Sequence, residues 1–165
     1  MKKAHWLLLL PAGIIIVLDQ VSKTWVTHGI DPYETVPLIS GFLNLVQVRN
    51  RGMAFGMLNR TDTDLHSYIL IAATLVAIVL ILFWFKRLRD EGHSAVIGLS
   101  LVLGGAIGNL IDRIRLQEVI DFLDFHIGSY HWPAFNLADS AITVGTIWLA
   151  IYLLFLGQAS TKNRK

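Results

Sequence analysis

The sequence predicts a mainly α-helical membrane protein with four transmembrane helices and a small β-sheet outside the bilayer. Composition is the first reason: 54% of the 165 residues are hydrophobic and 16% are charged, whereas soluble domains have about 25% charged residues. The second is that the chain has four apolar stretches, each close to the ~20 residues that cross ~30 Å of hydrocarbon. The third is that lysine and arginine lie beside the ends of these stretches, where they set membrane orientation.

The predicted spans comprise residues 6–26, 68–85, 95–112 and 139–156. The start of the chain, Met1-Lys2-Lys3 followed by an apolar run, also fits a secretory signal peptide. That run ends in Asp19-Gln20-Val21-Ser22-Lys23 instead of a small-residue cleavage site. We therefore interpret the first span as a retained membrane anchor.

Short basic segments predict that both termini and the loop after the second span are cytoplasmic, because the positive-inside bias acts in short segments beside span ends. These segments contain Lys2, Lys3, Lys86, Arg87, Arg89, Lys162, Arg164 and Lys165. An even number of spans agrees with this orientation. It leaves two extracytoplasmic segments, residues 29–66 and 114–137. We find no repeat or linker, so residues 1–165 are expected to form a single integral-membrane domain.

The first outer segment is expected to contribute a small sheet that lies on the membrane. Turn signals precede residues 42–48, a run with β-branched residues and partial alternation, which is typical of strands. The second outer segment is short and carries Phe122, Phe125, Tyr130 and Trp132. Aromatic side chains of this kind favour the membrane interface.

Four aspartates are predicted to meet at one level, at the outer face of the membrane. Asp19 lies ~20 Å along the first helix from its start, given a rise of 1.5 Å per residue. Asp112 ends the third span, Asp139 begins the fourth, and Asp121 lies in the outer segment between them. A carboxylate at a bilayer boundary costs free energy, so we expect it to have a function. Two such groups from different segments can share one proton and activate water.

Some of these residues also have purely structural interpretations. Asp19 and Lys23 are four residues apart in the order that favours a helical ion pair, which would brace the bundle. Gly104 and Gly108 lie at a spacing that allows helices to approach closely. The glycine-rich run 50–56 fits an ordinary turn, or a backbone surface that an extended peptide can approach.

Asn109, Asp112 and Arg113 share one face of the third helix, because they lie at positions i, i+3 and i+4. At the membrane edge, the donor-rich side chains of Asn109 and Arg113 would pair with Asp112, or hold a substrate carbonyl or a lipid phosphate.

Several other chemistries lack support in the sequence. The chain has no cysteine, so it has no disulfide framework, thiolate nucleophile or thiolate metal site. The six histidines are scattered and no spacing favours a metal ligand set. We expect neither metal nor cofactor. A net charge of +2 is too small to predict nucleic-acid binding.

Five polar segments, in this order along the chain, resemble the motifs of bacterial lipoprotein signal peptidase, also called signal peptidase II. The resemblance covers nearly the whole chain, including the four spans. The segments are Asp19-Gln20-Val21-Ser22-Lys23, Asn50-Arg51-Gly52-Met53-Ala54-Phe55, Gly104 to Arg113, Val119-Ile120-Asp121-Phe122 and Phe135-Asn136-Leu137-Ala138-Asp139.

This resemblance implies an aspartic endopeptidase of the bacterial inner membrane, with an outer loop over an active site at the extracytoplasmic face. Its substrates would be diacylglyceryl-modified prolipoproteins, cut just before the lipidated cysteine. It implies that Asp121 and Asp139 are catalytic, whereas chemistry alone would not separate Asp121 from Asp124. It further implies that Asn50, Gly52, Asn109, Arg113 and Asn136 position the substrate, and that Asp19, Lys23 and Asp112 support the site. Membrane lipid is the expected surrounding, and a monomer is sufficient for the chemistry.

Two close carboxylates cannot both ionise cheaply, so one of them is expected to hold a proton. Asp139 begins a helix, whose dipole favours the ionised form, and we expect it to act as the base. The proton belongs to the pair, however, and the two roles are open to exchange. Two other classes of protein fit the acidic residues: an ion-coupled transporter, and a lipoprotein chaperone that binds without cutting.

Overall fold

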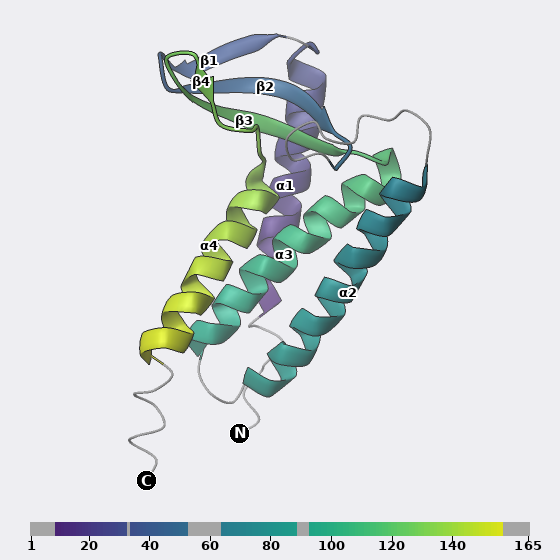
Figure 1. The fold of residues 1–165 in the computed structure, drawn as a ribbon, viewed down its shortest axis with the longest axis vertical. Coiled ribbons are helices and arrows are strands. Elements are labelled where there is room, and N and C mark those ends of the chain that lie inside the picture. The colour runs from purple at the N-terminus through teal and green to yellow at the C-terminus, as the bar shows by residue number, and fades with distance from the viewer. Residues whose placement is uncertain (1–8, 33, 53–63, 89–92, 157–165) are drawn as a thin grey trace.

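The structure, a computed structural model, describes residues 9–32, 34–52, 64–88 and 93–156 (Figure 1). Its helices are α1 (Leu10–Gly29), α2 (Asp64–Leu88), α3 (His93–Leu116) and α4 (Leu137–Ile151), which continues as the π-helical turn η3 (Tyr152–Leu156). The first residues of the first predicted span and the basic residues of both termini lie outside the described ranges. Within them, the helices form a bundle and the sheet lies across one end of it (Figure 1).

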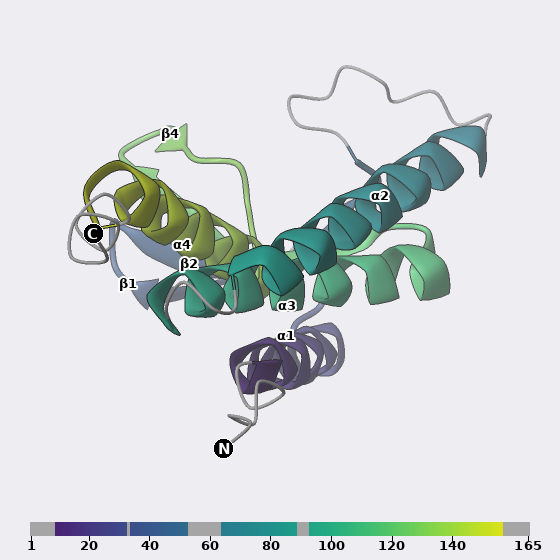
Figure 2. The ribbon, with the colours of Figure 1, turned by 90° about the horizontal axis from the view of Figure 1, so that it is seen from below.

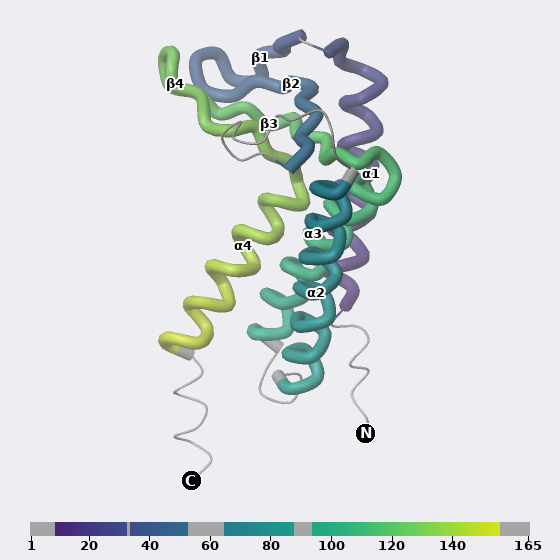
Figure 3. The backbone as a smooth tube through the Cα atoms, turned by 45° about the vertical axis from the view of Figure 1, so that its right-hand side comes forward, coloured from purple at the N-terminus to yellow at the C-terminus, as the bar shows by residue number. Residues whose placement is uncertain are grey.

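Among the residues that the structure describes, three helices are long and apolar enough to cross a membrane: Leu65–Arg87, Ser94–Leu116 and Leu137–Phe155. These findings confirm a mainly helical membrane fold. α1 is not among the three, because the polar Asp19, Gln20 and Lys23 interrupt its apolar sequence. Membrane crossing by α1 therefore remains a prediction. α1 begins and η3 ends away from the sheet, as an even number of crossings requires (Figure 3).

α3 is the central helix, with α1 on one side of it and α2 and α4 on the other (Figure 2). Glycine makes this packing possible. A Cβ atom at Gly104 would lie 2.8 Å from the carbonyl oxygen of Ala12 in α1, and one at Gly105 would contact the carbonyl oxygen of Ala138 in α4. The packing interpretation of Gly104 is thus confirmed, because any larger residue would push α1 away from α3.

The sheet is antiparallel, with strand order β1-β2-β3-β4. The strands are β1 (Thr35–Ile39), β2 (Leu43–Asn50), β3 (Val119–Ile127) and β4 (Tyr130–His131). The sheet predicted from residues 42–48 is confirmed. The sequence pattern missed β3, the longest strand, because most of its residues on both faces are buried and its apolar residues therefore do not alternate.

Two features hold the sheet over the bundle. A small core of Val26, Ile30, Leu45 and Phe122 joins the end of α1 to β2 and β3. The chain also passes from α3 into β3 through a turn of two residues and enters α4 after β4. The strand that carries Asp121 is therefore joined by short connections to α3, which carries Asn109 and Arg113, and through β4 to α4, which carries Asp139.

Candidate active site

A buried ion cluster joins α1 to α3 just below the sheet. The Lys23 Nζ atom lies 2.8 Å from Asp19 Oδ2 and 2.8 Å from Asp112 Oδ2, and all three side chains are buried. The amide of Gln20 donates to Asp112 Oδ1 at 2.9 Å. A buried ammonium between two carboxylates is costly to break, because removal of one partner leaves a buried charge unpaired.

Asp19 also connects α1 to the start of α4. Its Oδ1 accepts a hydrogen bond of 2.9 Å from the backbone N–H of Ala138, in the first turn of α4. Helix N-termini have backbone N–H groups without helical partners, and a carboxylate satisfies one of them. Gly108 lies beside this carboxylate, where a Cβ would come 2.6 Å from Asp19 Oδ2.

Asp139 occupies the first turn of α4 in a capping box. The Asn136 side-chain oxygen accepts from the Asp139 backbone N–H at 2.9 Å, and Asp139 Oδ2 accepts from the Asn136 backbone N–H at 3.3 Å. Asn109 in α3 donates its Nδ2–H to Asp139 Oδ1 at 2.8 Å. The carboxylate is thus held by its own helix start and by α3.

Asp121 lies on β3 and is only 2% exposed. Its Oδ2 accepts from Asn50 Nδ2 at 2.9 Å and its Oδ1 from Asn136 Nδ2 at 2.7 Å. Burial raises the pKa of Asp121 from its ordinary 3.8 to about 6; the hydrogen bond from Asn50 opposes this rise, the negative charge of Asp139 adds to it, and the bond from Asn136 opposes it.

Asn136 links the two carboxylates. Its amide nitrogen donates to Asp121, while its amide oxygen accepts from the backbone of Asp139. The same nitrogen lies 3.2 Å from Asn109 Oδ1, which also accepts from Lys23 Nζ at 2.9 Å. Because this oxygen of Asn109 faces two donors, its amide nitrogen is directed at Asp139. Lys23 therefore orients Asn109, the hydrogen-bond donor to Asp139, without contacting Asp139 itself.

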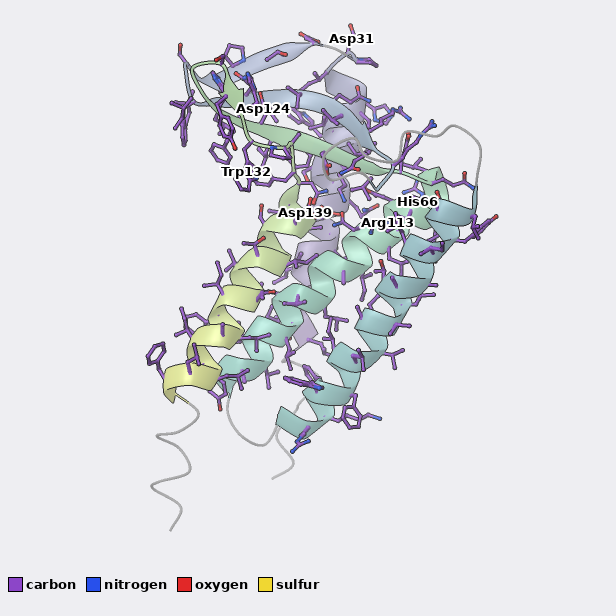
Figure 4. The ribbon with its side chains drawn as sticks, viewed as in Figure 1. Asp31, His66, Arg113, Asp124, Trp132 and Asp139 are labelled. Atoms are coloured by element: carbon purple, nitrogen blue, oxygen red, sulfur yellow. The ribbon has the colours of Figure 1, made fainter. Side chains whose placement is uncertain are left out.

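Gly52 and Arg113 complete the set of predicted residues. The Gly52 N–H donates to Asn50 Oδ1 at 2.9 Å, which turns the Asn50 amide nitrogen toward Asp121. Gly52 has φ +98°, and a Cβ there would contact Leu70 of α2, so glycine is required by the turn and by its contact with α2. A role for Gly52 in peptide binding stays a prediction. Arg113 lies near Asp139 (Figure 4) and interacts electrostatically with both Asp139 and Asp121.

Asp124 has different surroundings from Asp121, although only two residues separate them. Asn44 Nδ2 donates to Asp124 Oδ2 at 3.0 Å, and His131 Nδ1 lies 2.9 Å from Asp124 Oδ1. Burial tends to raise the pKa of Asp124, but the hydrogen bonds from Asn44 and His131 outweigh it and lower the pKa below its usual value.

The chain matches the family model for signal peptidase II over residues 12–155. It is 46% identical over 154 residues to the lipoprotein signal peptidase of Syntrophus aciditrophicus, with 93% of this chain and 96% of the relative covered. The chain is also 46% identical over 154 residues to the lipoprotein signal peptidase of Oleidesulfovibrio alaskensis, with 92% of this chain and 98% of the relative covered.

The chain belongs to the lipoprotein signal peptidase family. It is therefore an aspartic peptidase that removes signal peptides from prolipoproteins, and a multi-pass bacterial membrane enzyme. A solved structure of a bacterial membrane enzyme superposes with a TM-score of 0.77 at 31% identity, covering 96% of this chain and 91% of that one. Membership of a peptidase family favours hydrolysis over the transporter and chaperone alternatives.

In this lipoprotein signal peptidase, sequence reasoning missed two polar contributions around the site. Gln20 donates to Asp112 and to the carbonyl oxygen of Gly108, which adds a second link between α1 and α3. Buried Glu118 accepts from Arg49 at 2.7 Å and lies 3.4 Å from Arg51 Nε, beside the Asn50 turn. No local signal distinguishes these residues. The Asn136 cap, in contrast, has one: an asparagine three residues before an acid and just before an apolar run.

Proposed function

We propose that Asp121 and Asp139 are the catalytic pair of this signal peptidase. The observation that carries this proposal is that one fully buried residue, Asn136, donates hydrogen bonds to both carboxylates. Its side-chain amide donates to Asp121 and its backbone N–H donates to Asp139. β3 supplies one carboxylate and α4 the other, and Asn50 and Asn109 hold them from β2 and α3. A pair of aspartates held by amides can hold a proton between them and polarise water.

The environments of the two aspartates suggest different roles. Asp121 has its pKa raised to about 6, largely by burial, which favours its protonated form as the general acid. Asp139 lies at a helix N-terminus, where the dipole favours negative charge, and it acts as the base. Such an assignment describes the prevailing state of a coupled pair that holds one proton.

The proposed reaction is direct hydrolysis. Asp139 removes a proton from water, which attacks the carbonyl carbon before the lipidated cysteine. Asp121 donates a proton to the carbonyl oxygen. The tetrahedral intermediate then collapses: its hydroxyl group returns a proton to Asp121, the C–N bond breaks, and the proton that Asp139 took from water passes to the leaving nitrogen. This reaction requires neither a metal nor a covalent intermediate.

We further propose that the substrate is a diacylglyceryl-modified prolipoprotein and that Arg113, Asn109 and Asn50 position it. Asp19, Lys23 and Asp112 would keep α1, α3 and α4 in register, consistent with their buried ion cluster. In a topology of four spans with cytoplasmic termini, the sheet end of the bundle faces outside. A carboxylate pair at that boundary reaches water, while the signal helix and the acyl chains stay in lipid. Residues 1–165 would act as one domain, as a monomer.

The test is cleavage of a purified diacylglyceryl prolipoprotein by the purified protein in detergent. We compare wild type with Asp121→Asn, Asp139→Asn and the control Asp124→Asn, after a check that each variant is folded. Wild type and Asp124→Asn are expected to cut, and the other two to bind without cutting. Near-normal turnover by Asp121→Asn or Asp139→Asn would show that the chemistry lies elsewhere.

A further inference from the structure

An aromatic pocket lies beside the candidate active site, between the β3–β4 hairpin and the start of α4. It has a volume of about 440 Å³. We use the name aromatic pocket for the cavity lined by Phe42, Phe125, Ile127, Tyr130, Trp132 and Phe135, with His126 at its side. None of the lining side chains is an acid, lysine or arginine. The volume falls within the range of about 300–1,000 Å³ that holds small ligands.

The floor of the aromatic pocket is built from packed rings. The ring of Phe125 lies 5.0 Å from that of Phe42 and 5.5 Å from that of Phe135, measured between centroids. The backbone holds these rings in place, because Trp132 donates its N–H to the Phe125 carbonyl oxygen at 2.8 Å. A floor of this kind is preformed and requires little ordering when a ligand binds.

The rim, in contrast, is apolar and open. Ile127 is 74% exposed, and Tyr130 and Trp132 are also largely exposed. Figure 4 shows Trp132 on the helix side of the sheet, beside the outer end of α4. Apolar side chains gathered around a cavity at a bilayer boundary mark a binding surface, not a solvent-facing one.

The aromatic pocket adjoins the carboxylate pair, because residues of its lining lie next to site residues in the chain. Phe125 and Ile127 are alternate residues of β3 and share a face of the strand, which also carries Asp121. The backbone N–H groups of Phe122 and Leu123 both donate to the Phe135 carbonyl oxygen, which joins β3 beside Asp121 to the floor of the pocket. Asp121 and Phe125 are four residues apart, a separation that spans about 13 Å of strand. Phe135, on the floor, directly precedes Asn136.

We propose that the aromatic pocket binds an acyl chain of the lipidated substrate while the peptide bond lies at Asp121 and Asp139. This inference rests on the proposed function. A peptide segment would bring backbone N–H and C=O groups that need partners, and this lining offers few. An acyl chain has no polar groups to satisfy, and it is attached to the residue beside the scissile bond.

The position of the aromatic pocket beside Asp121 and Asp139 favours a substrate acyl chain over a bilayer phospholipid as its occupant. A chain seated in the aromatic pocket holds the glyceryl-cysteine at a set distance from the two carboxylates. Binding energy from a remote part of the substrate then orients the reacting bond. The peptidase would accordingly select lipidated over unlipidated substrates at this surface.

The test is kinetic and uses synthetic prolipoprotein peptides with two sixteen-carbon or two six-carbon acyl chains. The pocket variants are Ile127→Asp and Trp132→Ser, both at exposed positions whose change spares the core. Trp25→Ser is the matched control, because Trp25 is a similarly exposed tryptophan (62% against 59%) on α1, outside the aromatic pocket. Wild type and Trp25→Ser are expected to have a lower KM for the long chains. In Ile127→Asp, the KM for the long chains rises about tenfold, as expected when two buried methylenes lose their apolar surroundings.

The outcomes separate the two proposals. If wild type cleaves neither substrate, the proposed function is wrong. If it cleaves both and Ile127→Asp keeps the full chain-length dependence, the acyl pocket is wrong and the proposed function stands. A photoreactive diazirine at the end of the substrate's acyl chain should label residues 125–132. If the same group on phosphatidylglycerol labels these residues and excess substrate does not displace it, the pocket holds bilayer lipid and the proposal is overturned.

Discussion

Replacement of Asp121 by asparagine should make the protein's stability respond differently to pH. The folded protein raises the pKa of Asp121 from 3.8 to about 6, with burial as the largest cause. A raised carboxyl pKa means that the folded state binds this proton more tightly than the unfolded state does. Ionisation of Asp121 therefore costs stability, and the cost grows as pH rises from below 4 to above 6.

The size of the effect follows from the shift. One pKa unit corresponds to about 1.4 kcal/mol, so the shift of roughly two units costs about 3 kcal/mol at neutral pH. At pH 4.5 the same group costs about 1 kcal/mol, because part of the population is still protonated in both states. Asparagine cannot ionise. The free energy of unfolding of Asp121→Asn, relative to wild type, should thus rise by about 2 kcal/mol between pH 4.5 and pH 7.5.

This difference between two pH values is robust to lost hydrogen bonds. Asparagine accepts through one oxygen only, so one of the bonds from Asn50 and Asn136 is weakened, at a cost of about 1–3 kcal/mol. That cost is the same at both pH values and cancels in the comparison. The change in the free energy of unfolding with pH is therefore more informative than its sign at a single pH.

The assay is reversible unfolding in mixed micelles, followed by circular dichroism at several pH values. Asp124→Asn is the control on the same strand. Because the pKa of Asp124 is lowered, its ionised form stabilises the fold, and its loss should cost more as pH rises. Parallel pH profiles for Asp121→Asn and wild type would refute the claim that burial perturbs Asp121.

Three further predictions concern the support of the site. Lys23→Met should lower the free energy of unfolding by about 3–5 kcal/mol, because it leaves buried carboxylates unpaired; a loss under about 1 kcal/mol in the same unfolding assay would contradict the ion cluster. Gly105→Ala should cost about 1–3 kcal/mol by forcing α3 from α4, whereas Gly13→Ala, with nothing within 4 Å of the added Cβ, should change stability by less than about 1 kcal/mol in either direction; equal effects would argue against close packing. Asp139→Asn should lower the pKa of Asp121 without returning it to 3.8, because burial remains; carbon-13 NMR titration measures this, and an unchanged or raised pKa would show that the two carboxylates do not interact.

The pattern of apolar stretches was sufficient to predict the helices, because each helix satisfies its own backbone within a single stretch of chain. α2 is the plainest case: most of its apolar residues are exposed, and its boundaries lie close to the predicted span of 68–85. The sheet was predicted only in part. β3 escaped detection because Asp121, Asp124 and His126 interrupt its apolar sequence, and because its burial comes from helices and strands distant in sequence.

The sequence by itself determined the membrane class, the number of helices and the level at which the acids gather, since hydropathy and charge act on each segment separately. Its motif order also indicated the family. Only the tertiary structure decided how the polar residues are connected. It places Asp121, and not Asp124, against Asn136, and it directs Asn109 at Asp139 through Lys23. These contacts depend on strand register, a helix cap and glycine-mediated packing between segments far apart in the chain. Local sequence does not predict which amide donates to which carboxylate. These pairings depend on the distances and angles between elements after the elements have packed.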